Sequence, residues 1–286
     1  MTQRALREIA LSYDETVVLF ANTGQENEET LRFVERCDKH FGFNVVWVEA
    51  KVNPAKGQGT KFKLVDYNTA SRNGEPFEDV IKKYGIPNQA YPHCTRELKL
   101  QPMTAYLRHI GWKHKSYDTA IGIRADEVDR IHPDHKDHCF IYPMVKWGMT
   151  KPQVNAWWNE QPFRLKLKGY EGNCKWCWKK SLRKHLTLAK EHPEWYAFPM
   201  RMEQEHGLAG HNVDGTPRTF FRKHMTAGDI INMANTEQFE PATDDAVIYY
   251  DERLDLSDGC IESCEIDFTQ AEDIYQHELK LTIIDE

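Results

Sequence analysis

Two cysteines stand three positions apart in a turn-forming stretch, Cys174 and Cys177 in the run Gly-Asn-Cys-Lys-Trp-Cys-Trp-Lys-Lys. This spacing on a tight turn lets both sulfurs point at one tetrahedral metal ion or cluster. A redox dithiol is the alternative, but such pairs open a helix after a strand in a thioredoxin-like unit, and Lys and Trp surround this pair instead. We therefore predict a metal centre whose other ligands come from elsewhere in the chain.

Other cysteines differ in their surroundings. Cys94 follows His93 where a loop opens a predicted helix, and a helix N-terminus favours a thiolate, which suits a ligand or a reactive group. Cys37 lies on the apolar face of a predicted helix and is expected to be a core thiol. Cys260 and Cys264 lie in an acidic tail.

Three histidines also resemble a metal cluster. His132, His135 and His138 precede Cys139, but Pro, Asp and Lys separate them and no helical or strand period runs through the segment. We predict a solvated loop rather than a site.

The composition indicates one large domain with an appendage in a chain of 286 residues. No apolar run approaches the length of a membrane span and no signal peptide opens the sequence, so we expect a soluble, cytoplasmic protein. Seven cysteines, an odd number, favour reduced thiols over a disulfide framework. The net charge of -7 conceals a basic segment at 164–190 and an acidic one at 237–286.

Buried apolar strands alternate with amphipathic helices in the first half of the chain. This alternation predicts a doubly wound α/β fold with a parallel sheet, whose ligands bind beyond the carboxyl ends of the strands. The predicted strands are 16–21, 44–50, an edge strand 62–67, and 117–123, and the predicted helices are 5–11, 28–41, 76–84, 95–109, 150–160, 178–192 and 226–234.

Polar and basic residues follow two of these strands. Asn22, Thr23 and Gly24 follow the first, and Arg124 and Arg130 follow the strand at 117–123. A guanidinium forks onto phosphate or sulfate oxygens, so the arginines are candidates for holding such a group. Ion pairs with the nearby carboxylates of Asp126, Glu127 and Asp129 are an equal alternative.

The predicted helix at 178–192 has an apolar face and a basic face. Its apolar positions are Trp178, Leu182, Leu186 and Ala189, and we expect Lys179, Lys180, Arg183, Lys184 and Lys190 to point outward. Such a face is either simply solvated or a contact for nucleic acid, either tRNA or DNA.

Several of these motifs together resemble the phosphoadenosine phosphosulfate (PAPS) reductase family of the adenine nucleotide α-hydrolase-like superfamily, in the form carried by bacteriophages. The order and spacing match from about residue 17 to about residue 180. The matching pieces are Phe20-Ala-Asn-Thr-Gly24 with Glu29-Thr30, His93-Cys-Thr-Arg-Glu-Leu-Lys99 before Pro102, Gly122-Ile-Arg124 with Glu127 and Arg130, Pro143-Met-Val145 with Trp147, and the Cys174/Cys177 pair.

The resemblance implies a parallel sheet that binds an adenine nucleotide at its carboxyl edge. The residues that it places near the nucleotide are Asn22, Thr23, Gly24, Arg96, Lys99, Arg124 and Arg130. In iron-sulfur members, a Cys-Cys pair and a later Cys-x-x-Cys hold a four-iron (4Fe-4S) cluster. Three thiols match here, Cys94, Cys174 and Cys177, and His93, Cys260 and Cys264 compete as fourth ligand of an iron-sulfur cluster or a zinc ion.

The resemblance also implies a nucleophilic cysteine on the C-terminal tail. Cys264 is the candidate, but the acids beside it oppose thiolate formation unless basic residues lie against it, so we favour Cys264 as fourth ligand over Cys264 as nucleophile.

The sequence departs from the family at its start. The family opens with a strand and a Ser-Gly-Gly phosphate loop, and neither is present, so Met1 falls in the middle of the helix that would follow. We therefore expect residues 1–163 to form a nucleotide-binding domain without its central first strand, and 164–286 a metal-binding, helical and acidic region.

The implied function is that of a PAPS reductase-like oxidoreductase or sulfurtransferase acting on an adenine nucleotide or sulfonucleotide, with a thioredoxin-type reductant as partner. A nucleic-acid-modifying sulfurtransferase, for DNA phosphorothioation or tRNA thiolation, is the second hypothesis. A truncated, catalytically silent metal-binding scaffold is the third.

Overall fold

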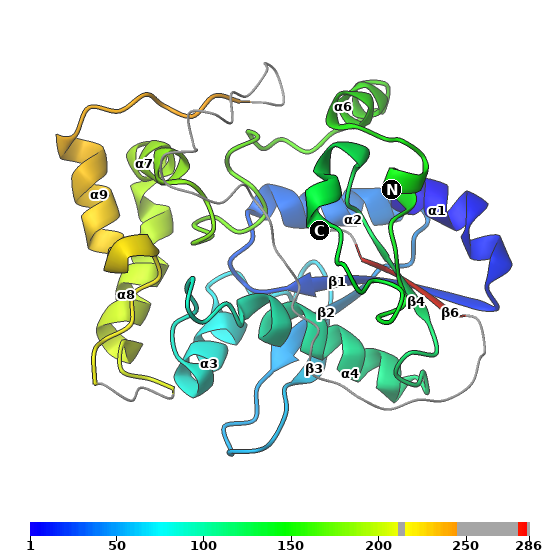
Figure 1. Cartoon of the computed structure of the whole chain (residues 1–286), viewed down its shortest axis with the longest axis horizontal. Coiled ribbons are helices and arrows are strands. Elements are labelled where there is room, and N and C mark those ends of the chain that lie inside the picture. Colours follow the sequence, from blue (N-terminus) through cyan, green and yellow to red (C-terminus); the bar gives the residue numbers. More distant parts are fainter. Residues whose placement is uncertain (211–214, 245–279, 285–286) are drawn as a thin grey trace.

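A mixed α/β arrangement is seen in the computed structural model, which describes residues 1–210, 215–244 and 280–284 (Figure 1). Its sheet has six strands in the order β3-β2-β1-β6-β4-β5. All neighbours pair in parallel except the edge strand β3, which is antiparallel to β2. The strands are β1 (Glu15–Asn22), β2 (Val46–Lys51), β3 (Lys61–Val65), β4 (Asp118–Ile121), β5 (Phe140–Ile141) and β6 (Lys280–Ile284).

The helices lie on both sides of this sheet and beyond one end of it (Figure 1). They are α1 (Thr2–Glu8), α2 (Glu28–Phe41), α3 (Glu75–Tyr84), α4 (Gln101–His109), α5 (Pro143–Lys146), α6 (Lys151–Asn159), α7 (Leu182–Glu191), α8 (Ala197–His206) and α9 (Ala227–Thr236). Shorter turns of helix are η1 (Ala10–Ser12), the π-helical η2 (Arg96–Leu100), η3 (Ala125–Arg130), η4 (Pro193–Tyr196) and η5 (Arg222–His224).

Alternate residues of β1 explain why helices cover both faces of the sheet. Successive side chains of a strand point to opposite faces. Leu19 packs in a buried cluster with Leu107 of α4, whereas Val18 packs in another with Ala5 of α1. Each face of the apolar strand therefore needs its own helical layer.

The strand beside β1 in the middle of the sheet comes from the far end of the sequence. Glu15–Leu19 of β1 pair with 280–284 of β6, and β6 pairs in turn with β4. The sequence led us to expect a sheet without its central strand, and that expectation is wrong because β6 holds this position. Residues 280–284 thus belong to the sheet, although we assigned them to the C-terminal region.

A second layer of core forms where α7, α8 and α9 meet α3. Its largest fully buried side chains include Trp176, Tyr196 and Phe220. Trp176 stacks on Phe198 of α8, with ring centroids 5.6 Å apart. This core joins the segment that carries Cys174 and Cys177 to the helical end of the molecule.

Candidate functional site

The loop after β1 is fully buried. Asn22 Nδ2 donates to Glu49 Oε1 at 2.7 Å and to the carbonyl oxygen of Ser71 at 2.8 Å. Asn22 has no exposed surface. This amide therefore holds the end of β1 against β2 and the segment before α3.

Gly24 is required by a close approach of two backbones. Its φ is +80°, and a Cβ at this position would lie 3.0 Å from the Cα of Gly74, at the start of α3. An L side chain would be strained in both respects. Gly24 thus allows the loop to pack directly against α3.

A buried carboxylate organises the same loop. The backbone N–H and the hydroxyl of Thr23 both donate to Glu26, at 2.9 and 2.8 Å. Burial raises the pKa of Glu26, and the positive charge of Lys99 and the Thr23 hydrogen bonds act against that rise. Thr23 and Lys99, separated along the chain, thus face one acidic group.

The cysteine turn docks on this loop. The N–H of Asn27 donates to the carbonyl oxygen of Asn173 at 3.0 Å, and the N–H of Lys175 donates to that of Gln25 at 3.2 Å. The indole N–H of Trp176 donates to Gln25 Oε1 at 2.7 Å. The structure therefore places the Cys-x-x-Cys turn at the carboxyl end of β1.

The side chains of Cys174 and Cys177 are hydrogen-bonded to each other. The hydrogen bond between the two side chains lowers the pKa of Cys177 and raises that of Cys174. The charge of Lys180 further favours a Cys177 thiolate, and Lys180 Nζ donates to the carbonyl oxygen of Cys174 at 2.6 Å. Two convergent sulfurs with one readily ionised are a donor pair suited to zinc or iron.

Cys94 lies against the same hydrophobic core as Trp176 and Trp178. It does not join Cys174 and Cys177 in a group whose ligand atoms all lie within 4.8 Å, and the sole such group in the described ranges is Glu78, Glu205 and His206. Sulfurs around one zinc ion stand about 3.8 Å apart for Zn–S bonds of about 2.3 Å. The described thiols therefore do not by themselves form a closed site for a single ion, whereas the thiolates of a cluster bind different irons and stand farther apart.

The Glu78 group is already neutralised by cations. Lys82 and Arg201 each pair with Glu78, at 2.9 and 2.8 Å. We therefore assign it a structural role in joining α3 to α8.

Two of the predicted fourth ligands, Cys260 and Cys264, lie outside the described residues. The third, His93, is largely buried, and its Nε2 is 3.1 Å from the carbonyl oxygen of Gly85. Burial lowers the pKa of His93 to about 4, so its imidazole is neutral near pH 7. A neutral imidazole is the form that binds metals.

Arg96 and the two downstream arginines have carboxylate partners. Arg96 Nε donates to Glu97 at 2.9 Å, Arg124 pairs with Asp126 at 3.0 Å and with Glu127 at 3.1 Å, and Arg130 pairs with Glu127 at 2.7 Å. The ion-pair alternative is therefore present in this structure for Arg124 and Arg130.

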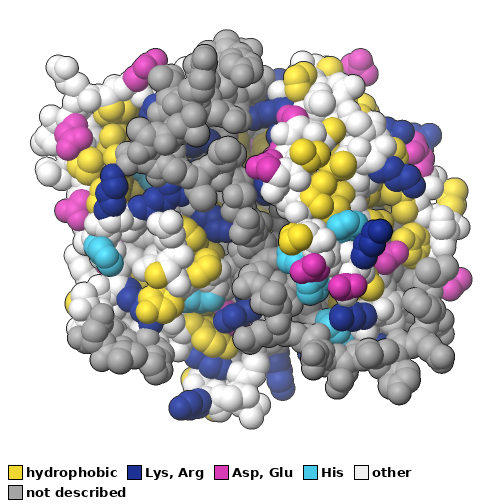
Figure 2. Space-filling view, viewed as in Figure 1, with side chains coloured by type: hydrophobic (Ala, Val, Ile, Leu, Met, Phe, Trp, Pro, Cys, Tyr) yellow, Lys and Arg dark blue, Asp and Glu magenta, His cyan; other side chains and the backbone are white. Residues whose placement is uncertain are grey.

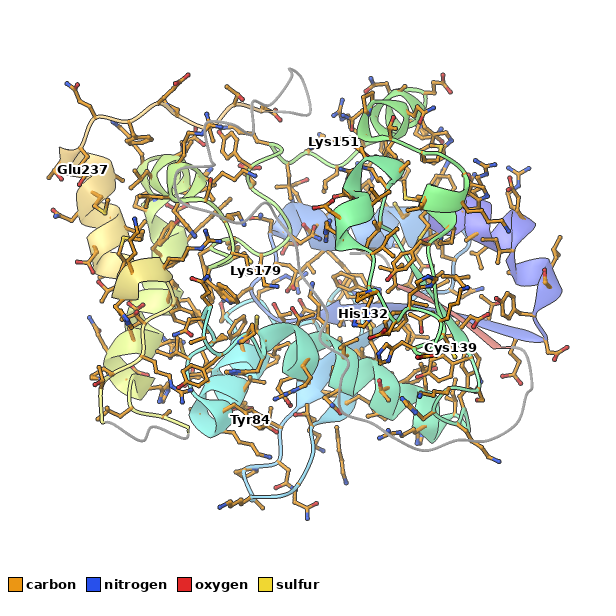
Figure 3. The ribbon with its side chains drawn as sticks, viewed as in Figure 1. Tyr84, His132, Cys139, Lys151, Lys179 and Glu237 are labelled. Atoms are coloured by element: carbon orange, nitrogen blue, oxygen red, sulfur yellow. The ribbon has the colours of Figure 1, made fainter. Side chains whose placement is uncertain are left out.

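The histidine loop has the character expected of a surface segment. His132 and His138 pack ring against ring, with centroids 4.9 Å apart, and both are partly exposed. Figure 2 shows histidines among acidic and basic side chains in the part of the view where Figure 3 labels His132 and Cys139. Within the described ranges these residues form no three-ligand group.

The basic helix differs from its prediction. It begins at Leu182 with Ser181 as N-cap, and Trp178 to Lys180 form a turn before it. Lys180 and Lys184 are only 5% and 8% exposed. The expectation that both point outward is wrong. Two of the lysines that we expected to be available for contact with nucleic acid are therefore buried.

Three contributors to the site were not assigned roles from the sequence, namely Gln25, Glu26 and Lys180. The sequence signals that could have identified them were the polar run after the first strand and the pair of lysines after Cys177. Periodicity could not show that the two segments meet.

No helix in the described part of the chain is long and apolar enough to cross a bilayer.

Relatives are found among phage and archaeal proteins. The chain is 32% identical over 259 residues to the nin region protein ORF290 of Escherichia phage lambda, covering 87% of this chain and 84% of that protein. It is 29% identical over 167 residues to MJ0066 of Methanocaldococcus jannaschii and 25% identical over 145 residues to MJ0973 of the same organism, and in each case spans 28% of the archaeal protein. No family model matches, and no solved structure matches.

Proposed function

Because this chain belongs to the family of the phage lambda nin region protein ORF290, we propose one function for the whole family, that of a PAPS reductase-like enzyme. It acts on an adenine nucleotide or sulfonucleotide and carries a metal centre ligated by cysteines. In its reductase form a thiolate takes the sulfonate group from the nucleotide, and a thioredoxin-type dithiol then releases sulfite.

One observation supports this proposal more than any other. The Cys174/Cys177 turn is hydrogen-bonded to the loop that follows β1, at the sheet edge where α/β proteins bind nucleotides. Lys99 and Lys180, one from η2 and one from the turn itself, bring positive charge to the same place. Cations beside thiolates favour both metal ligation and attack on a sulfonate.

The proposal extends to the fold. The parallel strands with helices on both faces are compatible with a doubly wound, adenine nucleotide α-hydrolase-like sheet whose edge strand β3 is antiparallel.

Each side chain of the proposed site then has a role. Thr23 and Glu26 fix the loop, and Lys99 and Arg96 lie on the segment that faces it. Arg124 and Arg130 bind phosphate by exchanging their carboxylate partners for phosphate oxygens.

The metal centre has Cys174 and Cys177 as its chelating pair. Cys94 is the third ligand, and His93, Cys260 or Cys264 completes the set. The bound group, iron-sulfur or zinc, would hold together segments that are distant along the chain.

Protein purified without oxygen tests the metal centre. A broad absorbance near about 400 nm indicates iron-sulfur, and stoichiometric zinc in a colourless preparation indicates a structural ion. Cys177→Ser is expected to remove the metal, and Cys37→Ser, which changes a buried thiol of α2, is the control and should retain it. Wild-type protein free of both metals would refute the centre.

Calorimetry with PAPS tests the nucleotide site. Lys99→Ala and Arg124→Ala should each weaken binding by about tenfold or more, because a charge-assisted hydrogen bond contributes about 1.5–3 kcal/mol. Lys39→Ala, at an exposed lysine paired with Glu35 on α2, is the matched control. Equal affinities in all four proteins would refute these roles, and sulfite release from PAPS with a dithiol would identify the reductase form.

A further inference from the structure

Strands β2 and β3 and the loop between them form a ribbon that projects from the body of the molecule (Figure 1). Residues 51–65, which we call the basic ribbon, contain four lysines and no acidic residue. These lysines, Lys51, Lys56, Lys61 and Lys63, are all exposed. Figure 2 shows dark blue side chains at this projecting end of the molecule. In a chain with a net charge of -7, the basic ribbon is therefore a local positive surface.

The pairing of the two strands places like charges side by side. Lys51 lies directly opposite Lys61 in the antiparallel ladder, and directly opposed like charges destabilise a strand pair. Lys63 pairs with Glu49 at 3.6 Å. Within the described ranges, Lys51, Lys56 and Lys61 have no carboxylate at ion-pair distance. An anion bound across Lys51 and Lys61 would offset their repulsion.

Protection of the sheet edge does not explain all of these lysines. Lysines on an edge strand hinder its pairing with another chain, which is a sufficient reason for Lys61 and Lys63 on β3. Lys51 belongs to β2, which pairs with a strand on each side, and Lys56 lies in the loop. Neither of these two protects an edge, so their charge is available for a partner.

Hydrogen bonds tie the loop of the basic ribbon to α3. Lys83 Nζ donates to the carbonyl oxygen of Asn53 at 2.7 Å and to that of Gln58. The N–H of Ala55 donates to Asn53 Oδ1 at 2.9 Å, which closes a turn within the loop. A surface ordered in this way loses less conformational entropy when it binds a partner.

The shape and charge of the basic ribbon match duplex DNA. The major groove of B-DNA is about 12 Å wide and admits a two-stranded β-ribbon. Its phosphates carry one negative charge per about 1.7 Å of helix axis, and lysines bind them as point charges. An RNA duplex fits less well, because its major groove is deep and narrow. Since the chain as a whole is acidic, we expect DNA to contact it at the basic ribbon.

We propose that the basic ribbon is a binding surface for the phosphate backbone of duplex DNA, with Lys51, Lys56 and Lys61 as its main contacts. Phosphate contacts carry no sequence information, so the binding is independent of DNA sequence. Residues 51–65 include none of the residues assigned above to the nucleotide or the metal. The surface therefore extends beyond the proposed enzyme function.

Fluorescence anisotropy with a labelled DNA duplex of mixed sequence tests the proposal. The logarithm of the association constant of the wild-type protein should fall linearly with the logarithm of the salt concentration. Replacing Lys51, Lys56 and Lys61 together by Ala should reduce the magnitude of this slope by about 3, because each lost phosphate contact removes about 0.9. At about 50 mM salt, the same triple variant should bind at least about tenfold more weakly.

A charge-matched triple variant is the control. Lys39→Ala/Lys113→Ala/Lys136→Ala removes the same charge from three exposed lysines outside the basic ribbon. It should keep the affinity and the salt dependence of the wild-type protein. Arginine at positions 51, 56 and 61 keeps the charge and should also keep the affinity. Circular dichroism verifies that each variant is folded.

Three results would overturn the proposal. These are no binding of the duplex by the wild-type protein, equal weakening by the two alanine triple variants, and tighter binding of an RNA duplex or of single-stranded DNA than of duplex DNA. Because DNA binding is measured without PAPS or metal, its failure is distinguishable from failure of the proposed enzyme function.

Discussion

Two loops at the carboxyl edge of the sheet, beyond β1 and beyond β4, look alike in sequence but differ in structure. Beyond β1, the loop that contains Thr23 and Glu26 is buried and hydrogen-bonded to a turn about 150 positions away, as in the pair Trp176–Gln25. Beyond β4, Arg124 and Arg130 are partly exposed and pair with carboxylates two or three positions away.

This difference shows that contacts between segments distant in the sequence are concentrated at the loop beyond β1. Burial strengthens the attraction between charged or hydrogen-bonded groups. It also increases the free-energy cost of leaving a polar group without a partner. Local ion pairs at a partly exposed surface contribute little to stability. The β1 end should therefore be rigid and intolerant of change, and the β4 end should be able to exchange its partners for a ligand.

The largest effect is expected from β6, the strand that lies between β1 and β4. In β6, residue 283 pairs with Val18 on one side and Ala120 on the other. Ile283→Pro should lower the free energy of unfolding by about 3 kcal/mol or more, because proline removes a ladder N–H from a central strand. Chemical denaturation measures this loss, and hydrogen exchange should show lost protection in both β1 and β4.

Lys61→Pro is the matched control, because it lies at the first position of the edge strand β3 and should cost much less. Equal losses for the two proline variants would contradict the central position of β6.

The next largest effect compares the stability lost on truncating a tryptophan near the β1 loop with the loss near the β4 loop. Trp176→Ala removes a fully buried indole and leaves Gln25 without its partner, so we expect a loss of about 3–5 kcal/mol. Trp147, which follows α5 near the β4 end, is only partly buried, and Trp147→Ala should cost about 1 kcal/mol. Similar losses in urea denaturation would show that the two ends are equally well packed.

The smallest expected effect is on the pH dependence of stability, which should have opposite signs for Glu26 and Asp126. Burial raises the pKa of Glu26, so the native state binds its proton more tightly than the unfolded chain does, and stability falls as pH rises above about 4.3. Burial also acts to raise the pKa of Asp126, but Arg124 outweighs it and lowers that pKa, so stability is lost instead as pH falls below about 3.9.

Unfolding curves over pH 3–8 distinguish the two carboxyl groups. Relative to Glu26→Gln, the wild-type protein should lose stability as the pH rises, and relative to Asp126→Asn it should lose stability as the pH falls. The same sign for both comparisons would mean that the two ends have similar electrostatic environments.

Much of the fold could be predicted from the sequence because its signals are local. The helix at 28–41 has the predicted bounds, since its apolar stripe, first-turn acids and following Gly42 all indicate the same segment. Thr150, the first residue of the helix predicted at 150–160, caps α6 through a capping box. The expected core thiol, Cys37, is buried.

The missed elements depend on partners far along the chain. β6 is a short run in an otherwise acidic tail, and only pairing with β1 and β4 makes it a central strand. Lys180 and Lys184 were expected in solvent because helical periodicity assigns one apolar side, but neighbouring segments cover the other side as well.

The sequence by itself determined strands β1 to β4, helices such as α2 and α6, and the spacing of Cys174 and Cys177. Periodicity, helix caps and residue spacing are properties of short segments, so they can be recognised in the sequence without knowledge of the tertiary structure. Only the tertiary structure decided that the Cys174/Cys177 turn docks on Gln25 and that a carboxyl-terminal strand fills the middle of the sheet. Contacts between distant segments depend on which apolar and polar surfaces match once the chain is compact, and no local pattern contains that information.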